Sequence, residues 1–221
     1  MITGGMSLKI VEYLTELVPE RSDELRSMER VAHETGFPII GPAAGYFMYQ
    51  IARIMNAQRV FELGSGYGYS TAWFARAVQE NGGGVVYHVV WDDELSRKAR
   101  GHLEVLGYSD VVEYKRGEAV EALRHTEGTF DLIFNDIDKV GYPGSLDVIS
   151  KKLRSGGVLI VDNALWGGEV LNSTNRERNV MAIRELTTML TEDPGWISTI
   201  VPIRDGLLMA FRQSEMPAKV R

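Results

Sequence analysis

Apolar residues recur along this chain with two different periods. Near the N-terminus, spacings of three and four residues predict amphipathic helices at 7–18, 20–35 and 47–55. Residues 36–45 read GFPIIGPAAG, and this density of glycine and proline predicts a loop. Two helices are therefore expected ahead of the loop and a third directly after it.

From residue 59 onward, short apolar runs alternate with helical patterns. Strands are predicted at 59–63, 84–91, 111–115, 130–136 and 157–162. Helices are predicted at 70–80, 93–106, 118–124, 144–153 and 176–191. Such alternation is typical of βαβ units with right-handed crossovers and a mostly parallel sheet.

The C-terminal part departs from this alternation. Asp205-Gly206 stands between two apolar runs, WISTIVPI and LLMAFR, a pattern typical of an antiparallel hairpin. The prediction is therefore an α/β fold. Its seven-stranded, mostly parallel sheet has an antiparallel C-terminal hairpin, helices on both faces and extra N-terminal helices.

Composition narrows the class of protein. The chain has 221 residues, 44% apolar and 24% charged, which fits one globular domain over 1–221. A net charge of -6 disfavours a broad nucleic-acid surface, and the absence of cysteine excludes disulfides, thiolate metal sites and a cysteine nucleophile. No apolar run approaches membrane-spanning length, and the N-terminus lacks signal-peptide features, so we expect a cytoplasmic protein without membrane contact.

Two predicted strands end abruptly in acidic residues. Asp136 closes the first of them, and Asp162-Asn163 closes the second. Because ligands of open α/β sheets bind at the carboxyl ends of the strands, two carboxylates and an amide oxygen could converge there. Lys139 follows closely, so the pattern predicts a site for a hard cation with an amine beside it.

The segment 60–70, VFELGSGYGYS, predicts a strand, a glycine-rich turn and the start of a helix. Gly64 and Gly66 allow close approach of a ligand to the backbone, and Ser70 can cap the helix. A turn of this kind can also serve strand–helix packing alone. The acid Glu62 and the two bulky tyrosines differ from a pyrophosphate-binding loop and suit a ligand with a cationic amino-acid end, such as S-adenosylmethionine (SAM).

Three segments, FELGSGYGYS, FNDIDKVGY and GGVLIVDNALWGG, together resemble the metal-dependent catechol and caffeoyl-CoA type of class I SAM-dependent O-methyltransferases. The resemblance extends from about residue 36 to residue 212. It implies a Rossmann-like fold, SAM as cofactor, a divalent cation (Mg²⁺ first, Mn²⁺ or Ca²⁺ as alternatives) and a small ortho-dihydroxy aromatic acceptor. It also suggests a homodimer with the N-terminal helices and the segment after residue 166 as contacts, and a cofactor-covering loop within 1–40.

The resemblance assigns roles residue by residue. Asp136, Asp162 and Asn163 match the metal ligands, and Lys139 matches the general base. Positions matching cofactor contacts are Ile40, Glu62, Gly64, Gly66, Ser70, Ala119, Asp136 and Asp138. Acceptor contacts are expected at Lys139, Asn163 and Trp166. The alternatives are acids that cap strand ends, a solvated loop lysine, plain packing at Ile40 and Ala119, and packing against a partner chain at Trp166.

The tip of the second strand departs from the family pattern. Val90 stands where the family places the acid that binds the ribose hydroxyls. Asp92 or Asp93 could reach back to replace it, SAM could bind more weakly, or the cofactor could be a variant. Asp92 to Glu94 also suit a helix N-cap with acids in its first turn. Trp91 either packs against the adenine or faces the core.

Three functions follow from these patterns. The favoured one is a SAM- and cation-dependent O-methyltransferase acting on a catechol-like acceptor. The second is methylation of a hydroxylated RNA base; net acidity speaks against it, whereas basic clusters at 97–100, 151–154 and 176–178 leave it open. The third is a catalytically inactive, ligand-binding relative, which Val90 alone motivates.

Overall fold

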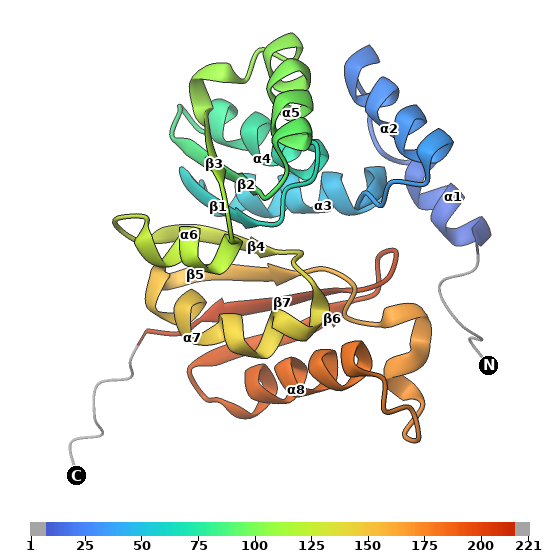
Figure 1. Cartoon of the computed structure of the whole chain (residues 1–221), viewed down its shortest axis with the longest axis vertical. Helices are drawn as coiled ribbons and strands as arrows, with labels where there is room; N and C mark the ends of the chain where they lie inside the picture. The colour runs from blue at the N-terminus through green and yellow to red at the C-terminus, as the bar shows by residue number, and fades with distance from the viewer. Residues whose placement is uncertain (1–7, 215–221) are drawn as a thin grey trace.

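The computed structural model describes residues 8–214, and its centre is one seven-stranded sheet (Figure 1). The strands are β1 (Arg59–Leu63), β2 (Val85–Val90), β3 (Val112–Arg116), β4 (Phe130–Asn135), β5 (Leu153–Val161), β6 (Trp196–Val201) and β7 (Leu207–Arg212). Their order is β3-β2-β1-β4-β5-β7-β6. Neighbours from β3 to β5 are parallel, whereas β7 is antiparallel to both β5 and β6. The predicted fold is confirmed.

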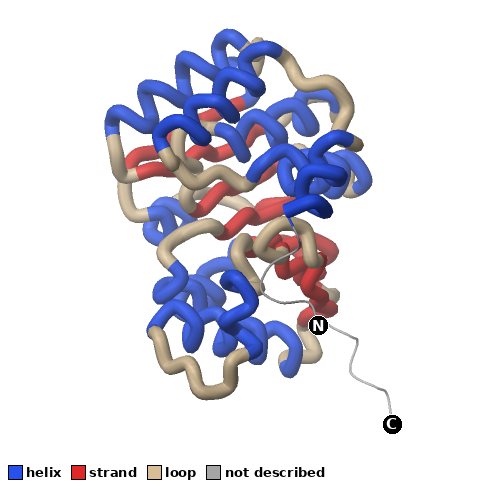
Figure 2. Tube along the Cα trace, turned by 90° about the vertical axis from the view of Figure 1, so that its right-hand side faces the viewer, coloured by secondary structure: helices blue, strands red, loops and turns tan. Residues whose placement is uncertain are grey.

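Helices cover both faces of the sheet (Figure 2). They are α1 (Leu8–Glu16), α2 (Asp23–Thr35), α3 (Gly41–Ile54), α4 (Tyr69–Glu80), α5 (Asp93–Val105), α6 (Ala119–His125), α7 (Tyr142–Lys152) and α8 (Arg178–Glu192), with short 3-10 turns η1 (Ser109–Val111), η2 (Lys139–Gly141) and η3 (Trp166–Leu171). Helices α2 to α5 pack on one face, and α6 to α8 pack on the other. No helix among residues 8–214 has the length and apolar character needed to cross a membrane.

The strands are apolar on both sides because both faces are covered. In β4, Leu132 and Phe134 belong to the core beneath α3 and α4, whereas Ile133 belongs to the core beneath α7 and α8. Buried parallel strands therefore read as continuous apolar runs rather than as alternating ones. This is why the runs at 130–136 and 157–162 are legible in the sequence.

The strand order reverses between β1 and β4, and this reversal creates a crevice at the carboxyl ends of the strands. The backbone N–H of Asp136 donates to the carbonyl of Leu63 at 2.8 Å, and that of Asp162 donates to the carbonyl of Asn135 at 3.1 Å. The loops that follow β1, β4 and β5 therefore leave the sheet side by side. Parallel register thus brings the two predicted acids to one place.

The predicted loop 36–45 is wrong in its second half, because α3 already begins at Gly41. Pro42 occupies the first turn of the helix, where a missing N–H costs no hydrogen bond. Gly45 packs against the indole of Trp73, and a Cβ at this position would lie 2.2 Å from the indole nitrogen. Gly45 therefore allows two helices to pack closely, and the sequence alone does not distinguish such a glycine from one in a loop.

Other differences concern the ends of elements. Strand β5 begins at Leu153, four residues before its predicted start, and α7 begins at Tyr142. The β6–β7 connection is longer than a two-residue hairpin turn, because residues 202–206 lie outside both strands. Residue 7, the predicted start of the first helix, lies outside the described residues.

Candidate active site

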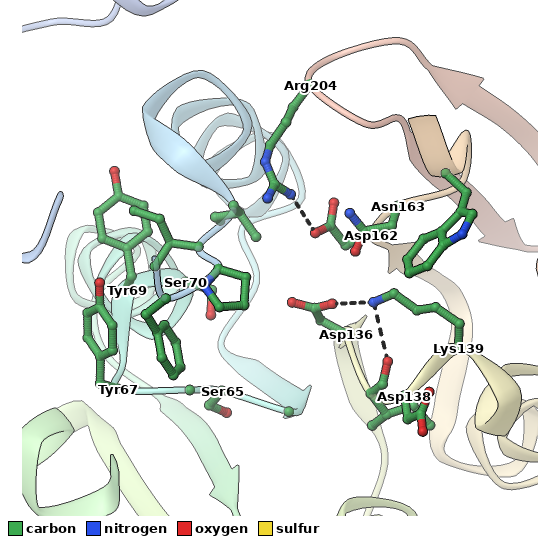
Figure 3. A pocket seen from close by; sticks show the side chains of 18 residues that line it. Ser65, Tyr67, Tyr69, Ser70, Asp136, Asp138, Lys139, Asp162, Asn163 and Arg204 are labelled. Carbon is green, nitrogen blue, oxygen red and sulfur yellow. Dashed lines mark hydrogen bonds and ion pairs between the residues drawn. The ribbon is translucent and has the colours of Figure 1, made fainter. Parts of the chain in front are cut away.

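A cavity of about 450 Å³ opens in the crevice between β1 and β4 (Figure 3). Its walls come from the segment 37–40, the glycine loop after β1, the segments that follow β4 and β5, and the β6–β7 loop. The predicted site residues that line it are Ile40, Gly64, Gly66, Ser70, Asp136, Asp138, Lys139, Asp162, Asn163 and Trp166. Folding therefore brings these predicted residues together from separate segments of the chain.

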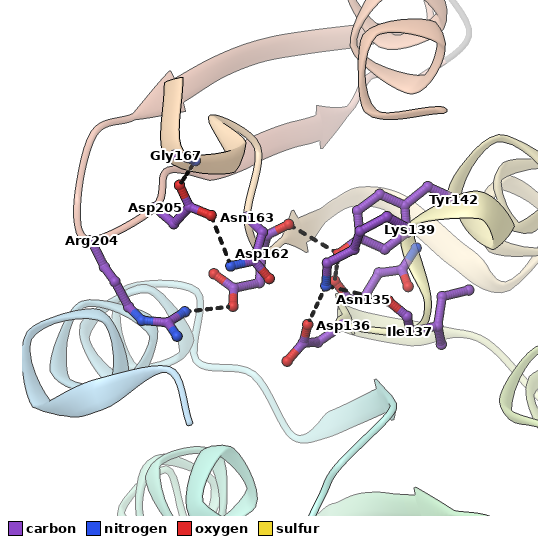
Figure 4. A network of polar contacts seen from close by, with 10 residues as sticks. All are labelled: Asn135, Asp136, Ile137, Lys139, Tyr142, Asp162, Asn163, Gly167, Arg204 and Asp205. Carbon is purple, nitrogen blue, oxygen red and sulfur yellow. Dashed lines mark hydrogen bonds and ion pairs between the residues drawn. The ribbon is translucent and has the colours of Figure 1, made fainter. Parts of the chain in front are cut away.

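The acidic part of the cavity carries two cationic side chains. The amine of Lys139 donates to Asp136 Oδ1 at 2.7 Å and to the carbonyl of Ile137 at 3.3 Å. The guanidinium of Arg204 donates to Asp162 Oδ2 at 3.0 Å. Figure 4 shows the two cations approaching the carboxylate pair from opposite sides. Sequence reasoning missed Arg204, because nothing local marks a hairpin residue as a neighbour of Asp162.

The charge of the two carboxylates is only partly compensated. Burial and the negative charge of Asp136 raise the pKa of Asp162 to about 6. Oδ1 of Asp162 is buried without a hydrogen-bond partner among residues 8–214. A buried carboxylate oxygen of this kind favours a bound cation, because an unpaired buried acceptor is costly.

Asp205 orients the third predicted ligand. Asn163 Nδ2 donates to Asp205 Oδ2 at 3.1 Å, so the amide oxygen of Asn163 is turned away from Asp205. The other oxygen of Asp205 accepts the backbone N–H of Gly167 at 2.6 Å, next to Trp166. Asp205 was predicted only as a turn residue, and it also holds the side of the cavity formed by Asn163 and Trp166.

The donor set suits a hard cation such as Mg²⁺, which prefers carboxylate and amide oxygens. Asp136, Asp162 and Asn163 supply such oxygens, and the unpaired Oδ1 of Asp162 is compatible with a ligand role. The described residues contain no group of three or more histidine, aspartate or glutamate side chains that could hold a metal ion. A metal here would therefore depend on two carboxylates, the amide and oxygens from outside the chain.

Glu62 lies beneath the glycine loop and is fully buried. One carboxylate oxygen accepts a hydrogen bond from the hydroxyl of Thr71, and the other has no partner among the described residues. Burial raises the pKa of Glu62 to about 7. Hydroxyl groups oppose this rise in the pKa, but Glu62 has no ion pair among the described residues, and it lies behind the cavity wall rather than in its lining.

The tip of β2 lies outside the cavity lining. Val90 is buried, and Trp91 is 72% exposed, so its predicted alternative place in the core is wrong. Asp92 caps α5 by accepting the N–H of Leu95 at 2.8 Å, which confirms the helix-cap interpretation, and Asp93 pairs with Arg116.

Ala119 also lies outside the cavity lining. It begins α6 and is buried in the core beneath α6 to α8. The structure therefore places Trp91, Asp92 and Ala119 apart from the predicted residues gathered around the cavity.

The bulky tyrosines of the glycine loop have a structural role that the sequence did not reveal. The hydroxyl of Tyr67 donates to the carbonyl of Met28 at 2.9 Å, and that of Tyr69 donates to Glu29 at 2.8 Å. Phe37 packs on the ring of Tyr67, with 4.8 Å between centroids. The tyrosines thus fasten α2 and the segment after it over the loop, which closes one side of the cavity.

Backbone strain gathers around the cavity. Positive φ angles occur at four non-glycine residues within 8–214, and three of these residues line the cavity: Asn163 at 56°, Trp166 at 48° and Arg204 at 54°. Left-handed conformations at such residues cost free energy and concentrate at functional sites. The strain therefore supports a functional role for this cavity.

A family model described as O-methyltransferase matches residues 15–213 of the chain. The chain belongs to the O-methyltransferase family. Among its relatives is a catechol O-methyltransferase from Niastella koreensis, 28% identical over 210 residues, which cover 90% of this chain and 94% of that protein. The resemblance inferred from the three motifs is thereby confirmed.

Solved structures of O-methyltransferases share the fold. The enzyme from Bacillus cereus, in complex with SAH, superposes with a TM-score of 0.84 at 27% identity, covering 93% of this chain and 97% of that one. An O-methyltransferase of tomaymycin synthesis from Streptomyces achromogenes, in complex with SAM, gives a TM-score of 0.83 at 25% identity, with coverages of 93% and 96%. This O-methyltransferase is therefore a SAM-dependent enzyme with the Rossmann-like methyltransferase fold.

Proposed function

We propose that the chain transfers the methyl group of SAM to a hydroxyl of a small ortho-dihydroxy aromatic acceptor. Asp136, Asp162 and Asn163 would hold a divalent cation, and Lys139 would act as general base. The observation that carries the proposal is the convergence of these four side chains on one cavity beside the glycine loop. The relative from Niastella koreensis, named for catechol methylation, supports the acceptor class.

The acceptor half would work through a buried amine. Lys139 is 8% exposed and is held at Asp136, so its amine points into the cavity rather than into solvent. In its neutral amine form, Nζ of Lys139 would take the hydroxyl proton while the oxygen attacks the methyl carbon; the S–CH₃ bond breaks, the O–CH₃ bond forms and the sulfonium becomes a neutral thioether. A bound divalent cation would lower the pKa of the acceptor hydroxyl. Trp166 could stack on the aromatic ring.

The donor half would hold SAM by shape and charge. Gly64 and Gly66 expose backbone to the cavity, and Ser70 lines it at the start of α4. The buried carboxylate of Glu62 would favour the cationic amino-acid end of the cofactor, while Ile40 covers it from the other side. Holding donor and acceptor in line accounts for most of the rate gain in such a displacement.

The proposal is tested by methyl transfer from SAM to a panel of catechols, with Mg²⁺ and with a chelator. Activity should disappear with the chelator, return with excess Mg²⁺, and be lost in Asp136→Ala. The matched control is Asp147→Ala, which removes an exposed acid whose ion pair is with Lys151 on the surface of α7. Activity that survives both chelation and Asp136→Ala would overturn the cation-dependent mechanism.

In two of the three basic clusters, at 97–100 and 151–154, basic side chains are paired with acids, which weakens the RNA alternative. Arg97 pairs with Glu94, Lys151 pairs with Asp147, and Arg154 pairs with Asp131. Side chains neutralised by neighbouring acids contribute little to phosphate binding. RNA affinity that fell steeply with salt would revive this function. Calorimetry without detectable SAM binding would instead favour an inactive relative.

A further inference from the structure

Arg204 occupies a strained and rigidly held position in the β6–β7 loop. Its φ of 54° is unfavourable for a residue with a long side chain. The loop is fastened by the N–H of Ala164, which donates to the carbonyl of Gly206, and by the N–H of Leu165, which donates to that of Asp205, both at 2.9 Å. The backbone therefore fixes where the guanidinium enters the cavity.

The guanidinium is only partly used by the protein. Its single hydrogen bond with the described residues goes to Asp162 Oδ2 at 3.0 Å. A guanidinium has five N–H donors in a planar fork, so most of them remain for a ligand. The side chain is 32% exposed, which leaves these donors accessible from the cavity.

Arg204 also stands at the border between two hollows. It lines the main cavity together with Asp136, Lys139 and Asp162. It also lines a second hollow of about 540 Å³, whose other walls include α2, residues 36–39 and Pro42. An acceptor whose hydroxyls lie at Lys139 would thus have Arg204 on the far side of Asp162 (Figure 3). A side arm of the acceptor could pass Arg204 into the second hollow.

Neutralising Asp162 does not by itself require this residue. Lys139 neutralises Asp136 with a single ammonium charge, so a planar guanidinium is not needed for charge balance. A guanidinium is the group that binds carboxylates through two parallel hydrogen bonds. The guanidinium of Arg204, which uses one hydrogen bond at Asp162, is therefore suited to bind an anionic ligand in addition to balancing charge.

We propose that Arg204 binds a carboxylate of the acceptor, so that the preferred substrate is an ortho-dihydroxy aromatic acid rather than a neutral catechol. This inference rests on the proposed function and names the acceptor class for the same site. The acid group lies on the side of the aromatic ring that faces away from Lys139.

The test compares kcat/KM for 3,4-dihydroxybenzoate, 3,4-dihydroxycinnamate and the neutral 4-methylcatechol. The wild type should favour the acids by at least about tenfold. Arg204→Asn removes the guanidinium and keeps a residue that tolerates the left-handed backbone. This variant should lose about tenfold to a hundredfold in kcat/KM for the acids, mainly through KM, and the ratio of acid to neutral substrate should fall toward one.

Arg97→Asn is the matched control, because Arg97 lies on the exposed face of α5 and forms its ion pair with Glu94. It should keep the wild-type preference. Arg204→Lys keeps a positive charge without the planar fork of N–H donors, and it should retain only part of the preference for acids. This variant also provides the test if Arg204→Asn does not fold. Equal activity of the wild type on acids and 4-methylcatechol, or an unchanged ratio in the Arg204 variants, would overturn the inference and leave the proposed function standing. Failure of the wild type to methylate any of the three would overturn both.

Discussion

Glu62, Thr71 and His88 form a buried polar chain behind the glycine loop. The hydroxyl of Thr71 donates to Glu62 and also lies 3.0 Å from Nδ1 of His88. Burial lowers the pKa of His88 to about 3, so this histidine stays neutral over the working range of pH. The hydroxyl of Thr71 has one proton, which it can donate to an ionised Glu62 while its oxygen accepts a hydrogen bond from His88 Nδ1–H. The hydrogen bond from Thr71 favours the charged form of Glu62, but burial outweighs it and keeps the pKa raised.

We predict that SAM binding is coupled to release of a proton from Glu62. The pKa of Glu62 in the ligand-free protein is raised to about 7, and a cationic ligand favours the ionised carboxylate. The affinity for SAM should therefore be about tenfold lower at pH 6 than at pH 8. Calorimetry in buffers with different ionisation enthalpies measures the proton released. The prediction would be contradicted if no proton were released on SAM binding at pH 6. It would also be contradicted if the SAM affinity of Glu62→Gln depended on pH as that of the wild type does.

The same pKa shift acts on stability with a definite sign. Because the pKa of Glu62 is raised from 4.5 in the unfolded chain to about 7 in the folded one, the contribution of Glu62 to stability is fully present below pH 4.5. It is lost as the pH rises through 7. Bound SAM restores it, so the gain in melting temperature on adding SAM should be larger at pH 8 than at pH 6.

At the scale of elements, the glycine loop packs so closely against the segment after β4 that Gly64 has no room for a side chain. Gly64 has a φ of 86°, and a Cβ there would lie 2.6 Å from the carbonyl oxygen of Asp136. The strand ends β1 and β4 can approach closely only because this residue is glycine. The glycine loop and the segment at Asp136 are thus in direct contact.

We predict that Gly64→Ala lowers the free energy of unfolding by about 1–3 kcal/mol more than Gly82→Ala does. Gly82 has a similar φ of 98°, but no atom lies within 4 Å of the place that a Cβ would take, so it carries the backbone cost without the clash. Urea denaturation of both variants measures the difference. Equal destabilisation would show that the close approach to Asp136 does not matter.

At the scale of the whole molecule, the two faces of the sheet contribute different halves of the site. Helices α2 to α4 lie on the side of the glycine loop (Figure 1). The acids and Lys139 follow the ends of β4 and β5, on the side of α7. The β6–β7 loop contributes Arg204 and Asp205, which bind Asp162 and Asn163. The site therefore draws on the ends of β1, β4 and β5 and on the β6–β7 loop.

We predict a homodimer in which the exposed apolar residues of α1 and the turn that follows it contact the partner chain. Tyr13 and Leu17 are each 60% exposed, and Leu171 in the segment after residue 166 is 81% exposed. Burying such side chains is the usual source of dimer stability. The double variant Tyr13→Glu/Leu17→Glu should be monomeric in light scattering, whereas Val105→Glu, at a residue 70% exposed on α5, should remain dimeric. A wild-type monomer at micromolar concentration would exclude the dimer.

The sequence by itself determined the alternation of strands and helices, the glycine loop and the acids at the strand ends. These features can be predicted because each depends on residues that are close in the sequence. Buried parallel strands require continuous apolar runs, and tight turns require glycine. Polar residues follow where a strand leaves the core. Asp136, Lys139 and Asp162-Asn163 could be predicted for the same reason, once their strands were expected to be parallel.

Only the tertiary structure decided which distant residues complete the site. Arg204 reaches Asp162, and Asp205 reaches Asn163, across 42 positions in the sequence. The close packing of Gly45 in α3 against Trp73 in α4 is likewise a contact between residues distant in the sequence. Contacts of this kind arise from the pairing of β5 with β7 and from the packing of α3 on α4. They form only in the folded protein, so no local sequence pattern predicts them.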